Sequence, residues 1–101
     1  MTEHDIQNQI QIDLCKLGYR VFRANVGKVK MEDGRWFDTG LPKGFSDLFA
    51  IKDGRISFIE VKKPGGHIRP DQINFINQMR KLGCRAGIAY SSEDAIKICE
   101  E

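Results

Sequence analysis

The sequence has no long hydrophobic run. Its longest uncharged apolar stretches are about four to six residues, whereas a helix across a bilayer needs roughly 20. Cysteine is also scarce: Cys15, Cys84 and Cys99 are widely spaced and form no C-x-x-C pair, which excludes a common zinc motif. We expect all three to be small core residues in a reducing compartment. The acidic first residues lack the cationic start of a secretory signal, which favours a cytoplasmic location.

Several catalytic signatures are missing as well. His4 and His67 are isolated, so no pattern indicates a zinc site or a histidine-based nuclease. The chain contains no Walker-type glycine loop and no G-x-S-x-G motif. It therefore gives no support to an NTPase, a nucleotide cofactor or a serine hydrolase.

The 101 residues are enough for one core, and we expect a single domain over residues 1–101. Hydrophobic residues make up 41% and charged residues 30%, a composition that disfavours a disordered or collagen-like chain. The net charge is only +2, but residues 16–85 hold 15 basic and 7 acidic side chains, and the remaining acids lie near the two ends. This basic middle fits a nucleic-acid-binding surface and fits an ordinary solvated surface equally well.

Hydrophobic spacing and turn residues predict one mixed α/β sheet with helices on its faces. Apolar stripes at Ile6, Ile10, Leu14 and Leu17 and at Ile73, Ile76, Met79 and Leu82 each indicate a helix followed by a glycine. The predicted elements are a helix at 2–17, strands at 19–24, 46–52 and 55–63, a helix at 69–82, a strand at 85–90 and a helix from 91 or 92 to 99. Between them, residues 27–40 form a hairpin or a large loop around Asp33-Gly34.

Charged residues meet at one predicted end of the sheet. Asp53-Gly54 is typical of a two-residue hairpin turn, which places the start of the strand at 46–52 beside the end of the strand at 55–63. Asp47 should therefore lie near Glu60 and Lys62, which share one face of their strand. Two carboxylates can hold a hard divalent cation, normally Mg²⁺, and a lysine can act on the attacking water or on developing charge. A structural ion pair between Glu60 and Lys62 is the alternative.

The ordered set of motifs resembles a known family and covers nearly the whole chain. The matching segments are Glu3-x-x-Ile6-Gln7, Arg23-Ala24-Asn25-x-Gly27, Gly44-Phe45-Ser46-Asp47, Glu60-Val61-Lys62 and Gln72. Together they look like the VRR-NUC (virus-type replication-repair nuclease) domain of the PD-(D/E)XK nuclease superfamily. One position departs from the family pattern, because Ser46 stands where a proline usually precedes the aspartate.

The resemblance implies a restriction-endonuclease-like fold, with a central mixed β-sheet flanked by helices in the order α-β-β-β-α-β-α. It also implies hydrolysis of structured DNA with Mg²⁺ or Mn²⁺. Carried over by position, Asp47 and Glu60 bind the metal, the Val61 carbonyl is a third ligand and Lys62 is the catalytic lysine. Gln72 positions the lysine or the phosphate, and Glu3 completes the metal site through water. Apart from the resemblance, the basic and polar residues near the site make Arg23, Asn25, Lys28, Lys30, Lys63, His67 and Arg69 candidate DNA contacts. For the first four, a solvated loop is the alternative.

Minimal virus-encoded members of the resembled family act as homodimers, so we expect a homodimer that resolves four-way (Holliday) junctions in a bacterial or phage-infected cell. Val29, Met31, Trp36 and Phe37 are the expected contact residues, with Trp36 as the anchor. A flap- or nick-directed nuclease, and a non-catalytic DNA-binding or assembly module with the same fold, remain alternatives.

Overall fold

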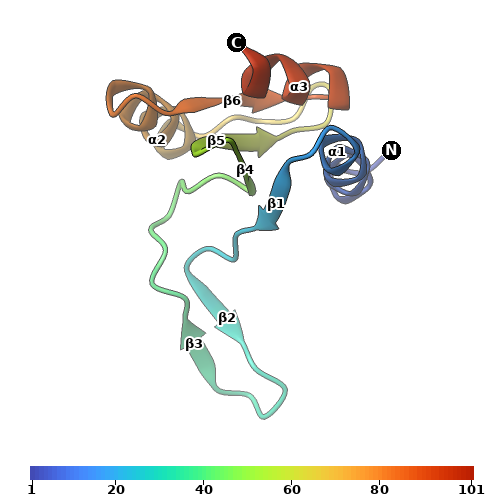
Figure 1. Cartoon of the computed structure of the whole chain (residues 1–101). Helices are drawn as coiled ribbons and strands as arrows, with labels where there is room; N and C mark the ends of the chain where they lie inside the picture. Colours follow the sequence, from blue (N-terminus) through green and yellow to red (C-terminus); the bar gives the residue numbers. More distant parts are fainter.

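The computed structural model describes residues 1–101 and consists of a central sheet, three helices and a separate hairpin (Figure 1). None of the helices is both long and apolar enough to span a membrane. In chain order, the elements are α1 (Glu3–Lys16), β1 (Arg20–Arg23), β2 (Lys28–Lys30), β3 (Trp36–Asp38), β4 (Leu48–Lys52), β5 (Arg55–Val61), α2 (Pro70–Lys81), β6 (Arg85–Ala89) and α3 (Ser92–Glu100).

The central sheet has the strand order β1-β4-β5-β6. The pairings of β1 with β4 and of β4 with β5 are antiparallel. The pairing of β5 with β6 is parallel, because α2 returns the chain to the end of the sheet where β5 begins. Without the hairpin, the element order is α-β-β-β-α-β-α, which confirms the predicted mixed sheet flanked by helices. Asp53 and Gly54, both with positive φ (53° and 75°), form the two-residue turn between β4 and β5.

Each face of the sheet is buried by different helices. On one face, Ile10 and Leu14 of α1 pack with Ile59 and Val61 of β5, and α3 completes this cluster. On the other face, the cluster is built around Phe58 of β5 and buried residues of α2. Alternation along β5 thus separates the two clusters, as the sequence pattern predicted.

The predicted apolar stripe is confirmed for α1 except at its end, where the C-cap residue Leu17 is exposed. For α2 the prediction is wrong, because Ile73 and Leu82 are 44% and 75% exposed. The inward face instead follows the i, i+3, i+4, i+7 spacing from a polar residue and consists of Gln72, Phe75, Ile76 and Met79. Because Gln72 is polar, the hydrophobic periodicity of the sequence did not identify this inward face.

The expectation that all three cysteines are core residues is also wrong. Only Cys99 is buried, whereas Cys15 is exposed and Cys84 is half-buried. Cys15 lies on the outward side of α1, next to the buried Leu14. The burial of a small residue is thus decided by its helix face and not by its type.

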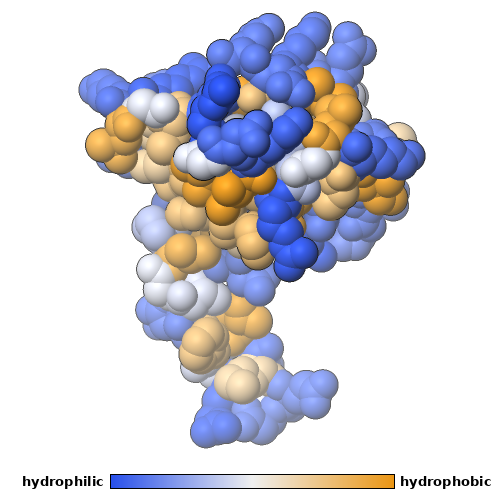
Figure 2. Space-filling view, viewed as in Figure 1, coloured by the Kyte–Doolittle hydropathy of each residue, from blue (hydrophilic) through white to orange (hydrophobic).

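Residues 28–38 form a hairpin that extends away from the body of the molecule (Figure 1). All six strand residues are exposed, and hydrophobic surface is visible along this projection in Figure 2. Val29 pairs with Phe37 and Lys30 pairs with Trp36, so Trp36 lies on the opposite face from Val29 and Phe37. A single flat partner that covers Val29 and Phe37 would therefore leave Trp36 uncovered.

Candidate active site

Asp47 and Glu60 meet at the rim of the sheet where β4 begins and β5 ends. Leu48 pairs with Ile59, and one further step along this antiparallel register places Asp47 opposite Glu60. At this point a side chain takes the place of a backbone acceptor on β4: Asp47 Oδ2 accepts a hydrogen bond from the Val61 amide at 2.9 Å. This replacement explains why β4 begins at Leu48, two residues later than predicted.

The Glu60 carboxyl is buried, with only 2% of the residue exposed. Burial is the largest cause that raises its pKa to about 8, and the negative charge and hydrogen bonding of Asp47 raise it further. The positive charges of Lys62 and Arg69 act in the opposite direction. Two acids are thus held together in a poorly solvated position, where either a proton or a cation relieves their repulsion.

Gln72 fixes the orientation of Glu60. Its Nε2 donates to Glu60 Oε2 at 3.1 Å, and its Oε1 accepts from the Arg69 amide at 3.0 Å at the start of α2. In the structure Gln72 contacts a carboxylate, and the expected contact with the lysine or the phosphate stays a prediction. The same glutamine caps the helix and orients the acid.

Lys62 directly follows β5 and is only 7% exposed. Its amide donates to the Ala89 carbonyl at 3.0 Å, which continues the pairing of β5 with β6 for one residue. The alternation of β5 puts its side chain on the same face as Glu60. The alternative of a structural ion pair is not observed, because no salt bridge joins Lys62 to Glu60.

Two small residues hold the segment that carries Asp47. The Ser46 hydroxyl, at the position where the family has proline, is buried and donates to the Leu48 carbonyl at 2.9 Å. Gly44 has φ +94°, and a Cβ atom there would lie 2.5 Å from the Asp71 carbonyl oxygen. This close approach joins the Asp47 segment to the first turn of α2, which carries Gln72. Sequence patterns identified Gly44 but not its contact with α2.

Glu3 also reaches this rim. A Cβ atom built on Gly66 would lie 3.3 Å from Glu3 Oε2 and 3.6 Å from Lys62 Cβ, so α1 delivers the acid beside the lysine. However, no three side chains among the acids, histidines and cysteines are arranged as a metal-binding group. Within the chain itself, the pair of Asp47 and Glu60 is therefore the centre of the site.

The pair has the chemistry that a divalent cation requires. Hydrogen bonds from the protein engage one oxygen of each carboxylate, Asp47 Oδ2 and Glu60 Oε2, and leave the other oxygens without an N–H donor. The Val61 carbonyl points to the same side of its strand as the Val61 amide, which faces Asp47. Oxygen donors of this kind suit Mg²⁺ or Mn²⁺.

All seven predicted DNA contacts are exposed. They lie on three different segments of the chain. Lys63, His67 and Arg69 lie in the connection that leaves the rim after β5. Arg23 ends β1 at the same rim, and Asn25 follows it. The remaining two, Lys28 and Lys30, lie on the hairpin.

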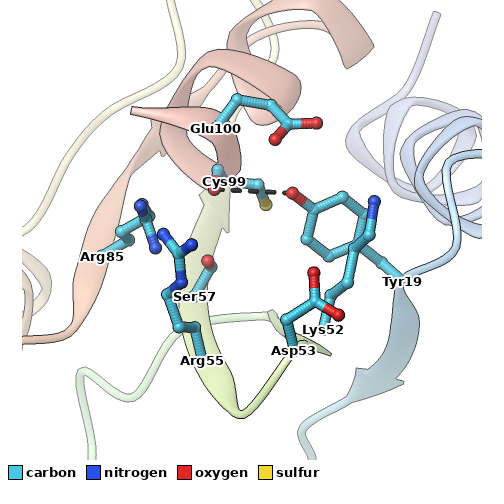
Figure 3. A pocket seen from close by; sticks show the side chains of 8 residues that line it. All are labelled: Tyr19, Lys52, Asp53, Arg55, Ser57, Arg85, Cys99 and Glu100. Carbon is cyan, nitrogen blue, oxygen red and sulfur yellow. Dashed lines mark hydrogen bonds between the residues drawn. The ribbon is translucent and has the colours of Figure 1, made fainter.

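A polar cavity of about 120 Å³ lies at the opposite end of β5 from the paired acids, beside the turn at Asp53 and Gly54 (Figure 3). It is lined by basic and acidic side chains below the C-terminal end of α3, where Tyr19 donates a hydrogen bond to the Cys99 carbonyl at 3.5 Å. Lys52 donates to the Leu17 carbonyl at 2.7 Å, at the end of α1. The basic side chains of this cavity lie near the C-terminal ends of α1 and α3, where the helix dipoles favour positive charge. The cavity is therefore remote from Glu60, which lies at the other end of β5.

The mixed sheet, its helices and the paired acids at one rim define a nuclease-type α/β domain. The family model of the VRR-NUC domain matches residues 1–93, and the chain belongs to this family. A solved structure described as a VRR_NUC domain matches 100% of this chain and 98% of its own length, with a TM-score of 0.70 and 23% sequence identity. At that identity, the likeness establishes the fold. The comparison with curated proteins returns no match.

Proposed function

We propose that this chain is a divalent-metal-dependent endonuclease that hydrolyses phosphodiester bonds in branched DNA. The main support is the juxtaposition of Asp47 and Glu60 on the rim of a VRR-NUC fold, beside Lys62. Two acids this close, one of them buried, repel each other when both are ionised, and a bound cation would relieve that repulsion without protonation of Glu60. The family assignment makes DNA the substrate class.

In this proposal, Asp47, Glu60 and the Val61 carbonyl hold Mg²⁺ or Mn²⁺, and Glu3 contributes through water. The bound cation supplies charge neutralisation at the phosphate and acidifies a water molecule. The chain itself keeps the site in place: the Val61 amide holds Asp47, and Gln72 holds Glu60. Lys62 orients or deprotonates the attacking water and stabilises developing negative charge.

We further propose that two copies act together on a four-way junction. One domain with one site cuts one strand per encounter, whereas resolution requires two symmetric cuts. A two-fold dimer supplies both sites, and its symmetry matches that of the junction. Val29, Met31 and Phe37 line one shallow groove on the exposed hairpin and are the candidate contact. The free thiols fit a reducing cytoplasm, in a bacterial or phage-infected cell.

The direct experiment is cleavage of a labelled four-way junction by the purified chain in Mg²⁺, Mn²⁺ or EDTA. We expect symmetric paired incisions with either metal and none in EDTA. Linear duplex, flap and nicked DNA of the same sequences are compared in parallel. Binding without cleavage in any metal would favour a DNA-binding module, and preferential cutting of flaps or nicks would replace the junction as substrate.

A further inference from the structure

The hairpin of residues 28–38 has a second face, opposite to the face that carries Val29 and Phe37. The register places Lys28, Lys30, Trp36 and Asp38 on this face. Trp36 is 63% exposed and is the only tryptophan in the chain. No aromatic ring and no cation stacks on its indole, so neither competes with a ligand for the exposed part of the ring.

The face that carries Trp36 has one net positive charge, from Lys28 and Lys30 against Asp38. Lys28 and Lys30 form no salt bridge, whereas two of the three nearby acids are engaged within the chain. Asp33 pairs with Arg35 at 2.7 Å, and Asp38 accepts the Gly40 amide at 2.9 Å. Lysines beside an open aromatic ring combine phosphate attraction with base stacking, and lysine is depleted from protein–protein interfaces.

The hairpin begins and ends at the rim that carries the candidate active site. It leaves from the end of β1, where the Ala24 amide donates to the Asp47 carbonyl at 2.8 Å. Its base is closed by hydrogen bonds from the Thr39 amide to the Gly27 carbonyl at 2.9 Å and from the Gly27 amide to the Leu41 carbonyl at 3.2 Å. Even fully extended, the segment from Asp38 to Asp47 spans at most ~30 Å. This length is shorter than ten base-pair steps of a DNA duplex, so the hairpin and the candidate active site are close enough to contact the same DNA molecule.

We propose that Trp36 stacks on a base whose stacking is interrupted at a DNA branch, while Lys28 and Lys30 contact the adjacent phosphates. This inference rests on the proposed function for its substrate class, and it assigns the selection of branched DNA to the hairpin. A regular duplex offers no free base face along its length, whereas a branch point does. The hairpin thus separates recognition of the branch from hydrolysis at Asp47 and Glu60.

The single tryptophan makes the proposal measurable without any variant. Tryptophan emission of the wild-type chain is titrated in EDTA with a four-way junction and with a linear duplex of matched sequence, both with hairpin-capped ends. We expect strong quenching by the junction and little by the capped duplex. Equal quenching by both, or none by the junction, would overturn the proposal.

Affinity measurements by anisotropy then separate stacking from charge. Trp36→Ala should weaken junction binding about tenfold and leave capped-duplex binding nearly unchanged, and Trp36→Phe should restore most of the loss. Lys28→Ala and Lys30→Ala should weaken binding to both DNAs and each lower the salt slope by about one. The matched controls Leu82→Ala and Lys81→Ala, at the far end of α2, should change neither. A Trp36→Ala loss that is equal for both DNAs would contradict stacking at a branch.

The readouts also separate this inference from the proposed function. Quenching in EDTA does not require hydrolysis, so a chain that never cuts DNA still supports the inference if the junction quenches Trp36. If emission instead changes with protein concentration alone, Trp36 is buried between two copies, and the proposed DNA contact is wrong.

Discussion

The Val61 amide donates a hydrogen bond to Asp47 Oδ2 at 2.9 Å, at the point where the backbone ladder between β4 and β5 has ended. The position of Asp47 is therefore set by the backbone of the neighbouring strand. Glu60, by contrast, is oriented by a side chain from α2, the amide of Gln72. Two different elements of the fold thus place the two acids, and substitutions can test them separately.

Conversion of either acid to its amide should abolish cleavage without loss of the fold. Asp47→Asn keeps an oxygen that can accept the Val61 amide, and Glu60→Gln removes a charge that is unfavourable in its buried position. We expect DNA binding in EDTA and the circular dichroism spectrum to stay close to wild type. Wild-type cleavage rates in both variants would contradict the assignment of Asp47 and Glu60 to the active site.

The raised pKa of Glu60 predicts how the stability of the metal-free protein depends on pH. The pKa of Glu60 in the folded state, about 8, lies above its ordinary value of 4.5, so between these two pH values the folded state holds a proton that the unfolded state has lost. Stability should be highest below pH 4.5 as far as this group is concerned. It should fall by a few kcal/mol as the pH rises to about 8 and then level off.

Thermal unfolding in EDTA across this pH range measures the effect. Glu60→Gln is the control, because its side chain cannot ionise, and its melting temperature should lack this decrease. Addition of Mg²⁺ or Mn²⁺ at pH 8 should raise the melting temperature of the wild type and not that of Glu60→Gln. Parallel pH curves for the two proteins would mean that Glu60 is not the responsible group.

Lys62→Ala should lower the cleavage rate on the order of a hundredfold, the usual scale for a group that positions water or stabilises charge. Lys63→Ala is the matched control, since the neighbouring lysine is exposed and lies beyond the end of β5. It should affect DNA affinity only. Single-turnover rates on the junction decide, and a loss under about threefold for Lys62→Ala would mean that Lys62 has no role in the chemical step.

Gly44→Ala tests the contact between the Asp47 segment and α2. Both Gly44 and Gly40 have positive φ, but a Cβ atom clashes only at Gly44, at 2.5 Å from the Asp71 carbonyl oxygen. Gly40→Ala should cost roughly 1–2 kcal/mol of unfolding free energy from its backbone conformation alone. Gly44→Ala should cost more and also reduce cleavage. Urea unfolding and cleavage rates of the two variants make the comparison, and equal effects would exclude a role for the contact.

The proposed dimer should dissociate when the apolar face of the hairpin is charged. Light scattering at micromolar concentration should report a dimer for the wild type and a monomer for Phe37→Asp. Leu82→Asp, at an even more exposed apolar residue at the C-terminal end of α2, should remain dimeric. A wild-type monomer, both alone and on the junction, would overturn the dimer and favour flap or nick cleavage.

Local patterns in the sequence were sufficient for most of the fold. The stripe at Ile6, Ile10 and Leu14 specified the inward face of α1, and the alternation along β5 separated the two hydrophobic clusters. The two-residue turn at Asp53 and Gly54 sets the register between β4 and β5, and this register brings Asp47 beside Glu60. These features were predictable because each depends on residues close in sequence and on a fixed period or turn length.

Tertiary contacts decided what remained. The inward face of α2 includes Gln72 because a buried carboxyl on β5 needs a hydrogen-bond donor, and no hydrophobic pattern records that need. The raised pKa of Glu60 likewise follows from burial beside Asp47, which only the packed sheet creates. Contacts between distant segments, such as Glu3 beside Gly66, depend on how α1 packs against the end of β5. Sequence periodicity identifies which residues of an element can face inward together, whereas the partner that each polar group meets is set by the assembled fold.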